Sequence, residues 1–333
     1  MLSVICPIYN EEKYIAKCID SILEQDYPKD DLEILFVDGM STDRTREIVK
    51  RYIEKYSFIR LFDNPKKIVP PALNIAIRAS KGNVIIRLDA HAFYPQNYFS
   101  LLVKKLNELQ ADNVGGVCRT LPINNTPKCV AIAKALSSSF GMGNSYFRIG
   151  VEKEMQVDTV PFGCFRRYIF DKIGMFDEEL IRNQDDEFNG RIIKNGGKIF
   201  LIPSLVIDYF ARDKIQKVWK MFYQYGLFKP LVNKKLGSPA SVRQFFPLVF
   251  VVGLILGMLI CWIHPILVWL YFGCIALYLL LAIVFASKDS NSVKVVFWII
   301  ISYITVHVGY GYGYLRGIFK LLFHQNFVVK ANR

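Results

Sequence analysis

Hydrophobic and polar positions alternate through residues 1–90 with two different periods, which predict strands and helices in turn. Apolar residues run almost without interruption through "LSVICPI", "LEILFV", "FIRLF" and "NVIIRL", which is typical of strands buried on both faces. Between these runs, apolar residues recur at helical spacing in 11–25, 44–56 and 72–80. The pattern predicts an α/β domain with a mainly parallel sheet that is covered by helices on both faces.

Polar side chains follow three of these strands at the point where each strand ends. They are Asn10 after the first strand, Asp38 after the second, and Asp89 and His91 after the fourth. The carboxyl ends of parallel strands meet at one edge of a sheet, where ligands of such folds bind. Asp89 and His91 are two residues apart in an extended segment, so they point in the same direction. We therefore expect a binding site at this edge, although each segment alone also fits a strand end followed by a polar turn.

No glycine-rich phosphate loop follows the first strand. Residues 7–11 read "PIYNE", without the glycines of a dinucleotide fingerprint, and the sequence has no Walker A lysine loop. The expected site is therefore built from carboxylates and other polar side chains.

Two stretches near the C-terminus contain no Asp, Glu, Lys or Arg: Gln244 to Ser287 and Val295 to Leu315. A helix that spans a bilayer needs about 20 apolar residues. Long core helices of a soluble domain are the alternative explanation. We predict membrane helices at 245–263, 266–286 and 295–315.

The segment "LGSPAS" (236–241) is the natural boundary between two domains. The first domain is expected to comprise residues 1–235, with amphipathic helices at 212–235 lying in the membrane interface. The second is expected to comprise residues 236–333 and to lie in the membrane.

Positive charge is concentrated in the C-terminal part of the chain. Residues 1–210 hold 28 Lys and Arg against 27 Asp and Glu, whereas residues 211–333 hold 14 against 2. A nucleic-acid-binding protein would carry its basic residues on the folded domain, so nucleic acid is not an expected partner. Cations beside the apolar segments, such as Lys229, Lys234 and Arg243, instead indicate an anionic cytoplasmic leaflet. We therefore expect a multi-pass protein of the inner or plasma membrane whose first domain faces the cytoplasm.

The same charges conflict with three complete membrane crossings. Lys288 and Lys294 place the second loop in the cytoplasm, so a third crossing would leave Arg316 and Lys320 outside, against the positive-inside rule. Three alternatives remain open: the first two segments form a re-entrant pair, the third segment does not cross, or the chain breaks the rule.

Six segments distributed over the chain combine glycine, aromatic and charged residues in the manner of conserved motifs. They read "VICPIYNEEKYIAKCIDSIL", "ILFVDGMSTDRT", "IIRLDAHAFYP", "GCFRRYIFDKIGMFDEEL", "NQDDEFNGRIIKNGGKI" and "VGYGYGYLRGI". In this order they resemble the inverting family 2 glycosyltransferases with a GT-A fold, over essentially the whole chain. The resemblance is greatest to membrane-anchored bacterial enzymes of succinoglycan and exopolysaccharide biosynthesis.

The resemblance implies a nucleotide diphosphate sugar as donor and a divalent metal ion that neutralises the leaving diphosphate. Asp89-Ala90-His91 stands where the family has its D-x-D motif, with His91 in place of the second Asp. Asp89, which also belongs to the donor site, and His91 are then the metal ligands. Hard oxygen ligands with an imidazole suit Mn²⁺ or Mg²⁺, and Mn²⁺ tolerates the nitrogen better. The alternative for His91 is to hydrogen-bond a metal ligand or to contact the donor phosphate.

The resemblance also implies donor-binding residues at the ends of the first two strands. Asp38 matches the family carboxylate that hydrogen-bonds the nucleobase or the ribose. The same pocket is lined by Pro7, Tyr9, Asn10 and Glu11.

Inversion at the sugar carbon needs one base that takes the proton of the acceptor hydroxyl. "NQDDE" (183–187) aligns with the family segment E-D-x-(D/E), so the resemblance assigns the base to Asp185, with Asp186 as the alternative. Gln184 replaces the Glu of that segment, and an acidic helix start exposed to solvent would also account for these residues. Gly163 matches the loop that meets the donor sugar and the acceptor, where glycine allows a close backbone approach.

The implied acceptor is a lipid-linked saccharide, which explains why a domain of the soluble type is attached to a membrane. Residues 223–229 read "YQYGLFK" where processive synthases have Q-x-x-R-W, so we expect transfer of a single sugar. Two alternatives remain. The chain could be a polyprenyl-phosphate glycosyltransferase, whose acceptor is already ionised, or a non-catalytic membrane scaffold with a degenerate transferase domain.

Overall fold

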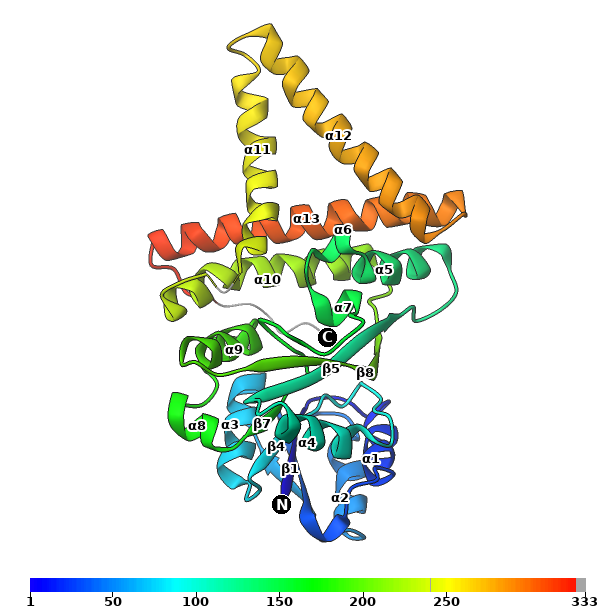
Figure 1. The fold of residues 1–333 in the computed structure, drawn as a ribbon, viewed down its shortest axis with the longest axis vertical. Coiled ribbons are helices and arrows are strands. Elements are labelled where there is room, and N and C mark those ends of the chain that lie inside the picture. The colour runs from blue at the N-terminus through cyan, green and yellow to red at the C-terminus, as the bar shows by residue number, and fades with distance from the viewer. Residues whose placement is uncertain (240, 328–333) are drawn as a thin grey trace. The chain divides into compact units, whose positions relative to one another are not determined.

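A computed structural model describes residues 1–239 and 241–327 of the chain (Figure 1). Its contacts divide the chain into two compact units, which we describe separately. The sheet unit comprises Met1–Arg119 and Gly150–Tyr209, and the helical unit comprises Thr120–Ile149 and Phe210–Arg333. This division differs from the boundary expected between residues 235 and 236. The reason is apolar packing, because helices that precede residue 236 bury their apolar faces against the C-terminal helices.

The sheet has eight strands in the order β3-β2-β1-β4-β7-β5-β8-β6. The first four strands in the chain pair in parallel, as expected, because β1 lies between β2 and β4 and β2 lies beside β3. All seven residues of β2 are buried, in keeping with a strand covered on both faces. The strands are β1 (Leu2–Ile8), β2 (Leu32–Asp38), β3 (Ile59–Asp63), β4 (Val84–Arg87), β5 (Asn113–Leu121), β6 (Met155–Gln156), β7 (Cys164–Arg166) and β8 (Ile199–Phe210).

The other half of the sheet corrects the expectation of a mainly parallel sheet. Strand β7 pairs antiparallel with both β4 and β5, and β6 pairs antiparallel with β8. The sheet as a whole is therefore mixed. The sequence pattern did not reveal β6 and β7 because these strands have only two and three residues, too few to show a period.

The helices of the sheet unit confirm the three predicted from apolar spacing. Predicted segments 11–25, 44–56 and 72–80 correspond to α1, α2 and α3. Helix α3 begins with Pro70 and Pro71 in its first turn, where the missing N–H groups cost no hydrogen bond. The helices are α1 (Ile15–Leu23), η1 (Lys29–Asp31), α2 (Thr45–Ile53), α3 (Val69–Ala79), α4 (Tyr98–Glu108), α8 (Tyr168–Ile173) and α9 (Gln184–Lys194).

Among its described residues, the helical unit contains three helices that are long and apolar enough to cross a membrane. They correspond to the predicted segments 245–263, 266–286 and 295–315, but the third helix continues to Leu322. The helices of this unit are α5 (Pro127–Ser137), α6 (Ser139–Met142), α7 (Tyr146–Ile149), α10 (Ile215–Leu236), η2 (Val242–Phe245), α11 (Phe246–Ile260), α12 (Pro265–Asp289) and α13 (Val293–Leu322).

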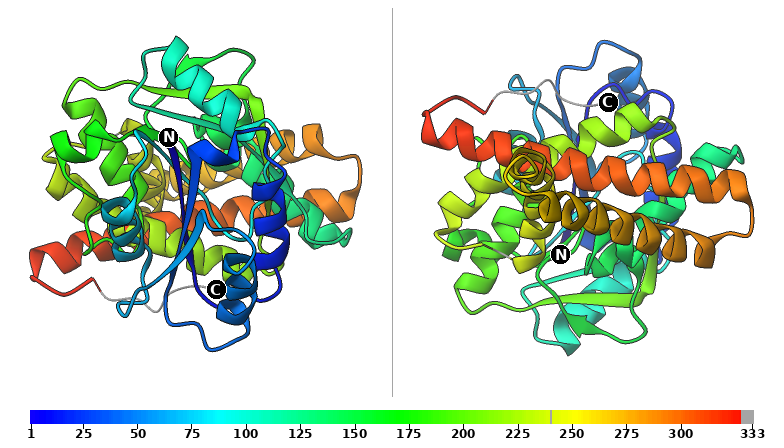
Figure 2. Two further views of the ribbon diagram at one scale, coloured as in Figure 1. Left: turned by 90° about the horizontal axis from the view of Figure 1, so that it is seen from below. Right: turned by 90° about the horizontal axis from the view of Figure 1, so that it is seen from above.

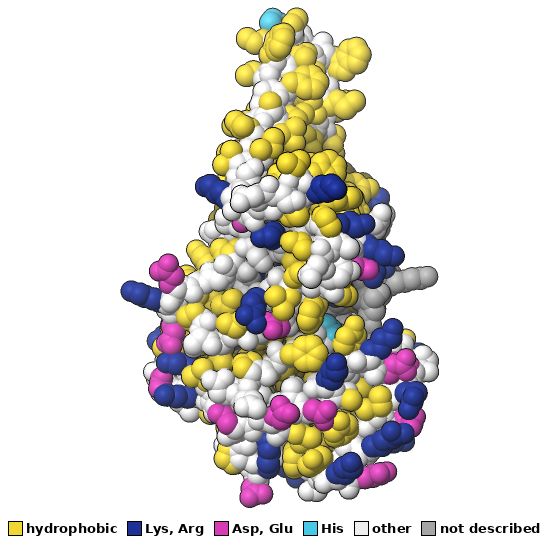
Figure 3. Space-filling view, turned by 90° about the vertical axis from the view of Figure 1, so that its right-hand side faces the viewer, with side chains coloured by type: hydrophobic (Ala, Val, Ile, Leu, Met, Phe, Trp, Pro, Cys, Tyr) yellow, Lys and Arg dark blue, Asp and Glu magenta, His cyan; other side chains and the backbone are white. Residues whose placement is uncertain are grey.

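Helices α11 and α12 form a hairpin that differs from the rest of this unit in its surface. Its far end carries large exposed apolar side chains, among them Trp262, Ile263 and Trp269. Figure 3 shows this hairpin mainly in yellow and white, with a cyan His side chain at its tip and dark blue Lys and Arg side chains near its base. Helix α13 instead runs beside α10 and crosswise to α11, which is seen end-on in the right panel of Figure 2.

Candidate active site

The loops that follow β1 and β2 are tied to each other by hydrogen bonds. The Asn10 backbone N–H donates to the Ser41 hydroxyl (2.8 Å), and the Asn10 side-chain oxygen accepts from the Thr42 N–H (2.8 Å). Asn10 has a left-handed backbone conformation (φ 54°), which asparagine adopts more readily than most residues. The Glu11 N–H donates to the Thr45 hydroxyl (2.7 Å). The structure thus brings two of the predicted strand ends together, as the parallel pairing of β1 with β2 requires.

Asp38 ends β2 with a side chain that has no exposed surface. Its carboxylate accepts hydrogen bonds from the backbone N–H and the hydroxyl of Ser41 and from Arg46 Nη1 (2.7 Å). Arg46 also pairs with Asp63 at the end of β3 (2.7 Å). In this geometry the Asp38 carboxylate holds the loop after β2. Its direct contact with a nucleotide stays a prediction, and requires one of these partners to move.

Pro7 and Tyr9 lie on either side of the last residue of β1, and both are partly exposed. Strand β4 pairs only with residues 2–5 of β1, so Pro7 lies past the end of that pairing. Tyr9 packs against Gly39, where an added Cβ would come within 3.3 Å of Tyr9 Cβ. Both residues therefore lie at the sheet edge where the sequence places the donor.

Tyr94 fixes the backbone of Asp89 just beyond the end of β4. The Tyr94 hydroxyl accepts from the Asp89 N–H (2.9 Å) and donates to the Asp89 carbonyl (3.2 Å). Tyr94 is buried and packs against Tyr98, with the ring centroids 5.0 Å apart. The aromatic residue after the predicted metal motif thus holds the turn that carries Asp89, a role that the sequence pattern did not reveal.

His91 lies against Glu11 from the loop after β1. Its Nδ1 is 3.3 Å from Glu11 Oε1, and the Glu11 side chain is buried whereas that of His91 is exposed. A carboxylate beside one ring nitrogen orients an imidazole, as outer-shell carboxylates do around metal sites. The contact therefore joins the predicted metal motif to the predicted donor pocket.

Arg87, the last residue of β4, connects two predicted functional residues. Its guanidinium is hydrogen-bonded to Asp185 Oδ1, and Nη2 lies 3.3 Å from Asp89 Oδ1. The Arg87 side chain is only 8% exposed, and its Nε has no hydrogen-bond partner among the described residues. A buried arginine in an apolar strand must be paired, so the lone charge in "VIIR" was the signal in the sequence. The sequence analysis did not assign this residue a role.

Asp185 lies in the first turn of α9. Aromatic packing and an ion pair fix the position of this helix. The Phe188 ring stacks on those of Phe176 (4.4 Å) and Phe170 (5.0 Å). Glu187 forms two hydrogen bonds with Arg191 (2.6 and 2.9 Å). Of the three acidic residues that begin α9, Glu187 therefore supports the helix itself, whereas Asp185 points to Arg87.

The pKa of the Asp185 carboxyl is raised above its ordinary value, chiefly because burial disfavours the charged form. The Arg87 guanidinium opposes this increase, and the neighbouring carboxylates of Asp89 and Asp186 add to it. A carboxylate with a raised pKa is a better proton acceptor near neutral pH than an ordinary one. Asp185 thus has the environment expected of a general base.

Gly163 lies immediately before β7, and the absence of a side chain there has a packing reason. An added Cβ would come within 2.4 Å of Asn113 Oδ1 and 2.5 Å of the Phe165 ring. The Gly163 carbonyl accepts a hydrogen bond from the Arg87 N–H (3.0 Å), which places this loop beside the end of β4. Close packing therefore accounts for the glycine, and an approach of the sugar to its backbone stays a prediction.

Asp89 and His91 offer ligand atoms that suit a divalent metal ion. Carboxylate oxygen and imidazole nitrogen are both accepted by Mn²⁺, whereas Mg²⁺ prefers oxygen alone. Within residues 1–239 and 241–327, no group of three or more His, Cys, Asp and Glu side chains is placed to hold a metal ion. Metal ions at nucleotide sites are commonly held by one or two protein ligands together with substrate phosphates. The two residues therefore fit a metal that binds with a nucleotide.

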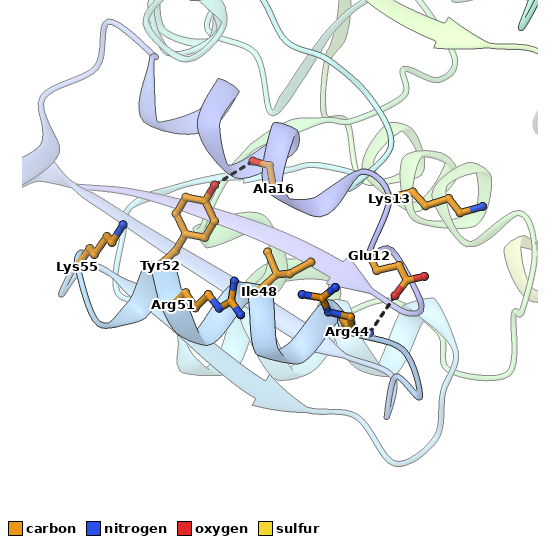
Figure 4. A pocket seen from close by; sticks show the side chains of 8 residues that line it. All are labelled: Glu12, Lys13, Ala16, Arg44, Ile48, Arg51, Tyr52 and Lys55. Atoms are coloured by element: carbon orange, nitrogen blue, oxygen red, sulfur yellow. Dashed lines mark hydrogen bonds between the residues drawn. The ribbon is translucent and has the colours of Figure 1, made fainter.

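A surface cavity between α1 and α2 is lined by other residues (Figure 4). Its lining includes the cations Lys13, Arg44, Arg51 and Lys55, together with Glu12. None of the predicted site residues lines it. The predicted site is thus defined by the strand ends and by Arg87 with its two partners, Asp89 and Asp185.

Comparisons with known proteins identify a matching family model and similar proteins. The model of a family described as Glycosyl transferase family 2 matches residues 3–174. The chain is 34% identical over 242 residues to a dolichyl N-acetyl-alpha-D-glucosaminyl phosphate 3-beta-D-2,3-diacetamido-2,3-dideoxy-beta-D-glucuronosyltransferase of Methanococcus voltae, covering 70% of this chain and 74% of the relative. It is 28% identical over 247 residues to the succinoglycan biosynthesis protein ExoA of Rhizobium meliloti, covering 74% of each.

A solved structure shows the same fold. The mannosyltransferase PcManGT from Pyrobaculum calidifontis, in complex with GDP-Man and Mn²⁺, aligns with a TM-score of 0.59 and 19% identity. The alignment covers 92% of this chain and 86% of the other. The family resemblance and the GT-A fold expected from the sequence are confirmed.

Proposed function

The chain belongs to glycosyl transferase family 2, an enzyme family that acts on nucleotide sugars, and from this membership we propose its specific reaction. The chain transfers one sugar from a nucleotide diphosphate sugar to a hydroxyl group of a lipid-linked saccharide, with inversion at the anomeric carbon. The Methanococcus voltae relative is named for a dolichyl-linked acceptor, and the apolar helices of this chain would keep it close to such an acceptor. ExoA, named for succinoglycan biosynthesis, supports a role in cell-surface glycans.

One observation carries the proposal: Asp89 and Asp185 contact the same guanidinium, that of Arg87. Asp89 belongs to the loop that would hold the donor diphosphate, and Asp185 is the expected base. A direct displacement needs the base and the leaving group positioned around one sugar carbon. The shared contact with Arg87 supports a site in which both carboxylates act on one such carbon.

In the proposed reaction, the Asp185 carboxylate takes the proton of the acceptor hydroxyl while the hydroxyl oxygen attacks the anomeric carbon. The new carbon–oxygen bond forms on the face opposite the diphosphate. The bond from the anomeric carbon to the diphosphate oxygen breaks, and its electron pair leaves with the nucleoside diphosphate. A single displacement of this kind inverts the anomeric configuration without a covalent intermediate.

Asp89 and His91 would hold a divalent ion, which acts as a Lewis acid towards the diphosphate oxygens when bound. Tyr94 keeps the Asp89 turn in place, and Glu11 orients His91. Arg87 favours the deprotonated form of Asp185, which is the form that accepts a proton. These residues thus bind and orient the reactants, while Asp185 handles the proton.

We also propose that the sheet unit faces the cytoplasm, where nucleotide sugars are found. The basic residues beside the apolar helices support this orientation, because anionic lipids attract cations to the cytoplasmic leaflet.

A screen of purified protein would test the function. Released nucleoside diphosphate is measured for a panel of nucleotide sugars with Mn²⁺, using either a polyprenyl-linked saccharide or a polyprenyl phosphate as acceptor. We expect one donor to react, and only with the saccharide. Transfer to the polyprenyl phosphate would replace this proposal with the polyprenyl-phosphate reaction. Absence of release with every donor would favour a non-catalytic scaffold.

A further inference from the structure

Helices α11, α12 and α13 are all apolar enough to span a membrane, but their surroundings differ. In the most apolar part of each helix, 17% of the α11 residues and 6% of the α12 residues are buried within the protein, compared with 39% in α13. A helix that faces lipid keeps its apolar side chains exposed in the protein structure. By this criterion α11 and α12 face lipid, whereas α13 packs against protein over a much larger share of its length.

The C-terminal half of α13 lies directly on α10. An added Cβ on Gly313 would come within 2.1 Å of the Tyr223 carbonyl oxygen, and one on Gly317 within 2.3 Å of the Leu227 carbonyl oxygen. Both contacts advance by four residues along each helix, so the two helices run side by side in the same direction. The repeated glycines of "VGYGYGYLRGI" therefore have a structural reason, which is backbone contact between α10 and α13.

Helix α10 is too polar to accompany α13 through a bilayer. Its 22 residues include five lysines. Lysine is among the residues that are most unfavourable at the centre of a membrane helix. The five are Lys217, Lys220, Lys229, Lys234 and Lys235.

The N-terminal half of α13 lies against α5 and α6, two helices separated by Ser138 in an extended conformation. The Tyr303 hydroxyl donates to the Ser138 hydroxyl (2.8 Å), and His307 Nε2 lies 2.9 Å from the Phe140 carbonyl oxygen. The Lys128 ammonium lies 5.3 Å from the centre of the Trp298 ring. A lysine ammonium is unfavourable in hydrocarbon, so the segment that carries Lys128 belongs outside it. Both halves of α13 are therefore bound to elements that belong outside the hydrocarbon region.

The two ends of the α11–α12 hairpin are attached to one layer of helices, formed by α5, α6, α10 and α13 with their connecting segments. Arg243, just before α11, donates to the Asn144 carbonyl, and Lys134 of α5 donates to the Asp289 carbonyl at the end of α12 (2.6 Å). Only residues 290–292 separate α12 from α13. The hairpin therefore leaves this layer and returns to it, and α13 then continues along the layer.

The outer face of α13 has the composition of a helix at a membrane surface. Large apolar side chains are exposed towards both of its ends, and cations occur near them in the sequence. The exposed apolar residues are Val293, Phe297, Tyr312, Phe319 and Leu322, and the interspersed cations are Lys294, Arg316 and Lys320.

From these contacts we propose that α13 does not cross the bilayer. It lies along the anionic lipid surface, together with α10 and α5, and only the α11–α12 hairpin enters the hydrocarbon. Arg316 and Lys320 are then on the same side as Lys288 and Lys294, which agrees with the positive-inside rule. Of the three alternatives that the sequence left open, the packing of α13 selects the one in which the third segment stays at the surface. The inference rests on the membrane attachment in the proposed function but not on the transfer reaction.

Spin labels that report depth would test this inference. Single cysteines replace Phe297, Val308 and Phe319 of α13 in the full chain, in nanodiscs of phosphatidylcholine and phosphatidylglycerol, after Cys261 and Cys274 have been changed to Ala. The remaining five cysteines are buried. Depth is measured from the relative access of oxygen and of a water-soluble nickel complex to the nitroxide. Matched labels at Trp269, Leu277 and Ile283 of α12 provide the depth profile of a helix inside the membrane.

We expect the three α13 labels to have the same shallow depth and the α12 labels to differ in depth along the helix. A membrane-spanning α13 would place Val308 about 16 Å deeper than Phe297 and Phe319, since each lies 11 residues away at about 1.5 Å per residue. Such a minimum at Val308 would overturn the inference. Nucleoside diphosphate release by each variant reports the enzyme separately, so a failure of the inference is not confused with a failure of the proposed function.

The side of the membrane reached by the end of α13 gives a second readout. Asn291→Cys and Gln325→Cys are treated with a membrane-impermeant maleimide in intact and in lysed bacterial cells. We expect both to react only after lysis. Reaction of Gln325→Cys, but not of Asn291→Cys, in intact cells would overturn the inference.

Discussion

Two clusters in the sheet unit have the same composition, an arginine between two aspartates, but opposite exposure. In the first cluster, Arg46 bridges Asp38 and Asp63, and in the second, Arg87 bridges Asp89 and Asp185. The bridging arginine is 30% exposed in the first cluster and 8% exposed in the second. The strand-end carboxylate of Asp38 has no exposed surface, whereas the side chains of Asp89 and Asp185 are 24% and 33% exposed.

Whether the arginine or the carboxylates are exposed indicates whether a cluster serves stability or ligand binding. A buried carboxylate with all its hydrogen bonds made holds the structure, and in the first cluster it fixes the loop after β2. A buried arginine with partly exposed carboxylates leaves those carboxylates accessible to a ligand while setting their charge. The first cluster is therefore expected to govern stability and the second to govern activity.

The largest effect is expected from Asp89→Ala. Removal of a ligand that holds the metal at the diphosphate should lower kcat by about 10³-fold or more, and EDTA should have a similar effect on the wild-type chain. His91→Asp should retain activity and shift the metal preference towards Mg²⁺, because oxygen replaces nitrogen. Initial rates with Mn²⁺ and Mg²⁺ would measure both effects. Full activity in EDTA would remove the metal role from Asp89 and His91.

Asp185→Asn should lower kcat by about 10²–10⁴-fold, the usual contribution of a general base. Donor affinity should change little, because the two side chains have nearly the same shape. Asp186→Asn is the matched control and should lower kcat much less. Transfer rates combined with calorimetric donor binding would distinguish the variants. If the Asp186 variant is the inactive one, the base has been assigned one residue too early.

Arg87→Met and Arg46→Met form a pair that tests the comparison directly. The Arg87 charge lowers the pKa of Asp185 and so opposes the effect of burial. Without this charge, the pKa of Asp185 should rise further. At a fixed pH below the new pKa, kcat should fall about tenfold for each unit of increase and recover as the pH rises. Arg46→Met should leave kcat unchanged at every pH. Equal losses in both variants would show that the two clusters do not differ in function.

The smallest effect on activity is expected from Asp38→Asn. The substitution weakens the bonds to Arg46 and Ser41 inside the protein, so the free energy of unfolding should decrease by about 1–3 kcal/mol. The Asp63 side chain is 58% exposed, so Asp63→Asn should change the free energy of unfolding much less. Urea unfolding of the variants, with donor binding measured in parallel, would test this. A large loss of donor affinity at unchanged stability would instead place Asp38 in direct contact with the nucleotide.

The parallel half of the fold could be predicted from the sequence because its pattern is strong. Long apolar runs and helical spacing gave β1 to β4 and α1 to α3, and the parallel geometry then brought Asn10 and Asp38 to one edge. The antiparallel half could not be predicted in this way. Its strands are short or irregularly spaced, and their pairing is set by contacts far apart in the chain, such as Asn113 with Phe165.

The functional residues also divide into those that the sequence could predict and those that it could not. Asp89, His91 and Asp185 could be named because they fall in motifs of a family that the chain resembles. Arg87 was missed because its role depends on the contact with Asp185, which lies 98 residues further along the chain. The opposite exposure of the two clusters was also invisible, since a sequence does not state which member of an ion pair is buried.

The pH dependence of single-turnover transfer tests the central claim, that Asp185 is the base, most directly. The wild-type rate should rise with pH through an apparent pKa above that of an ordinary aspartate, because burial raises the pKa of Asp185 and only its deprotonated form accepts a proton. Asp185→Asn should be slow and lack this rise, whereas Asp186→Asn should keep it. A rise that persists unchanged in the Asp185→Asn variant would contradict the account.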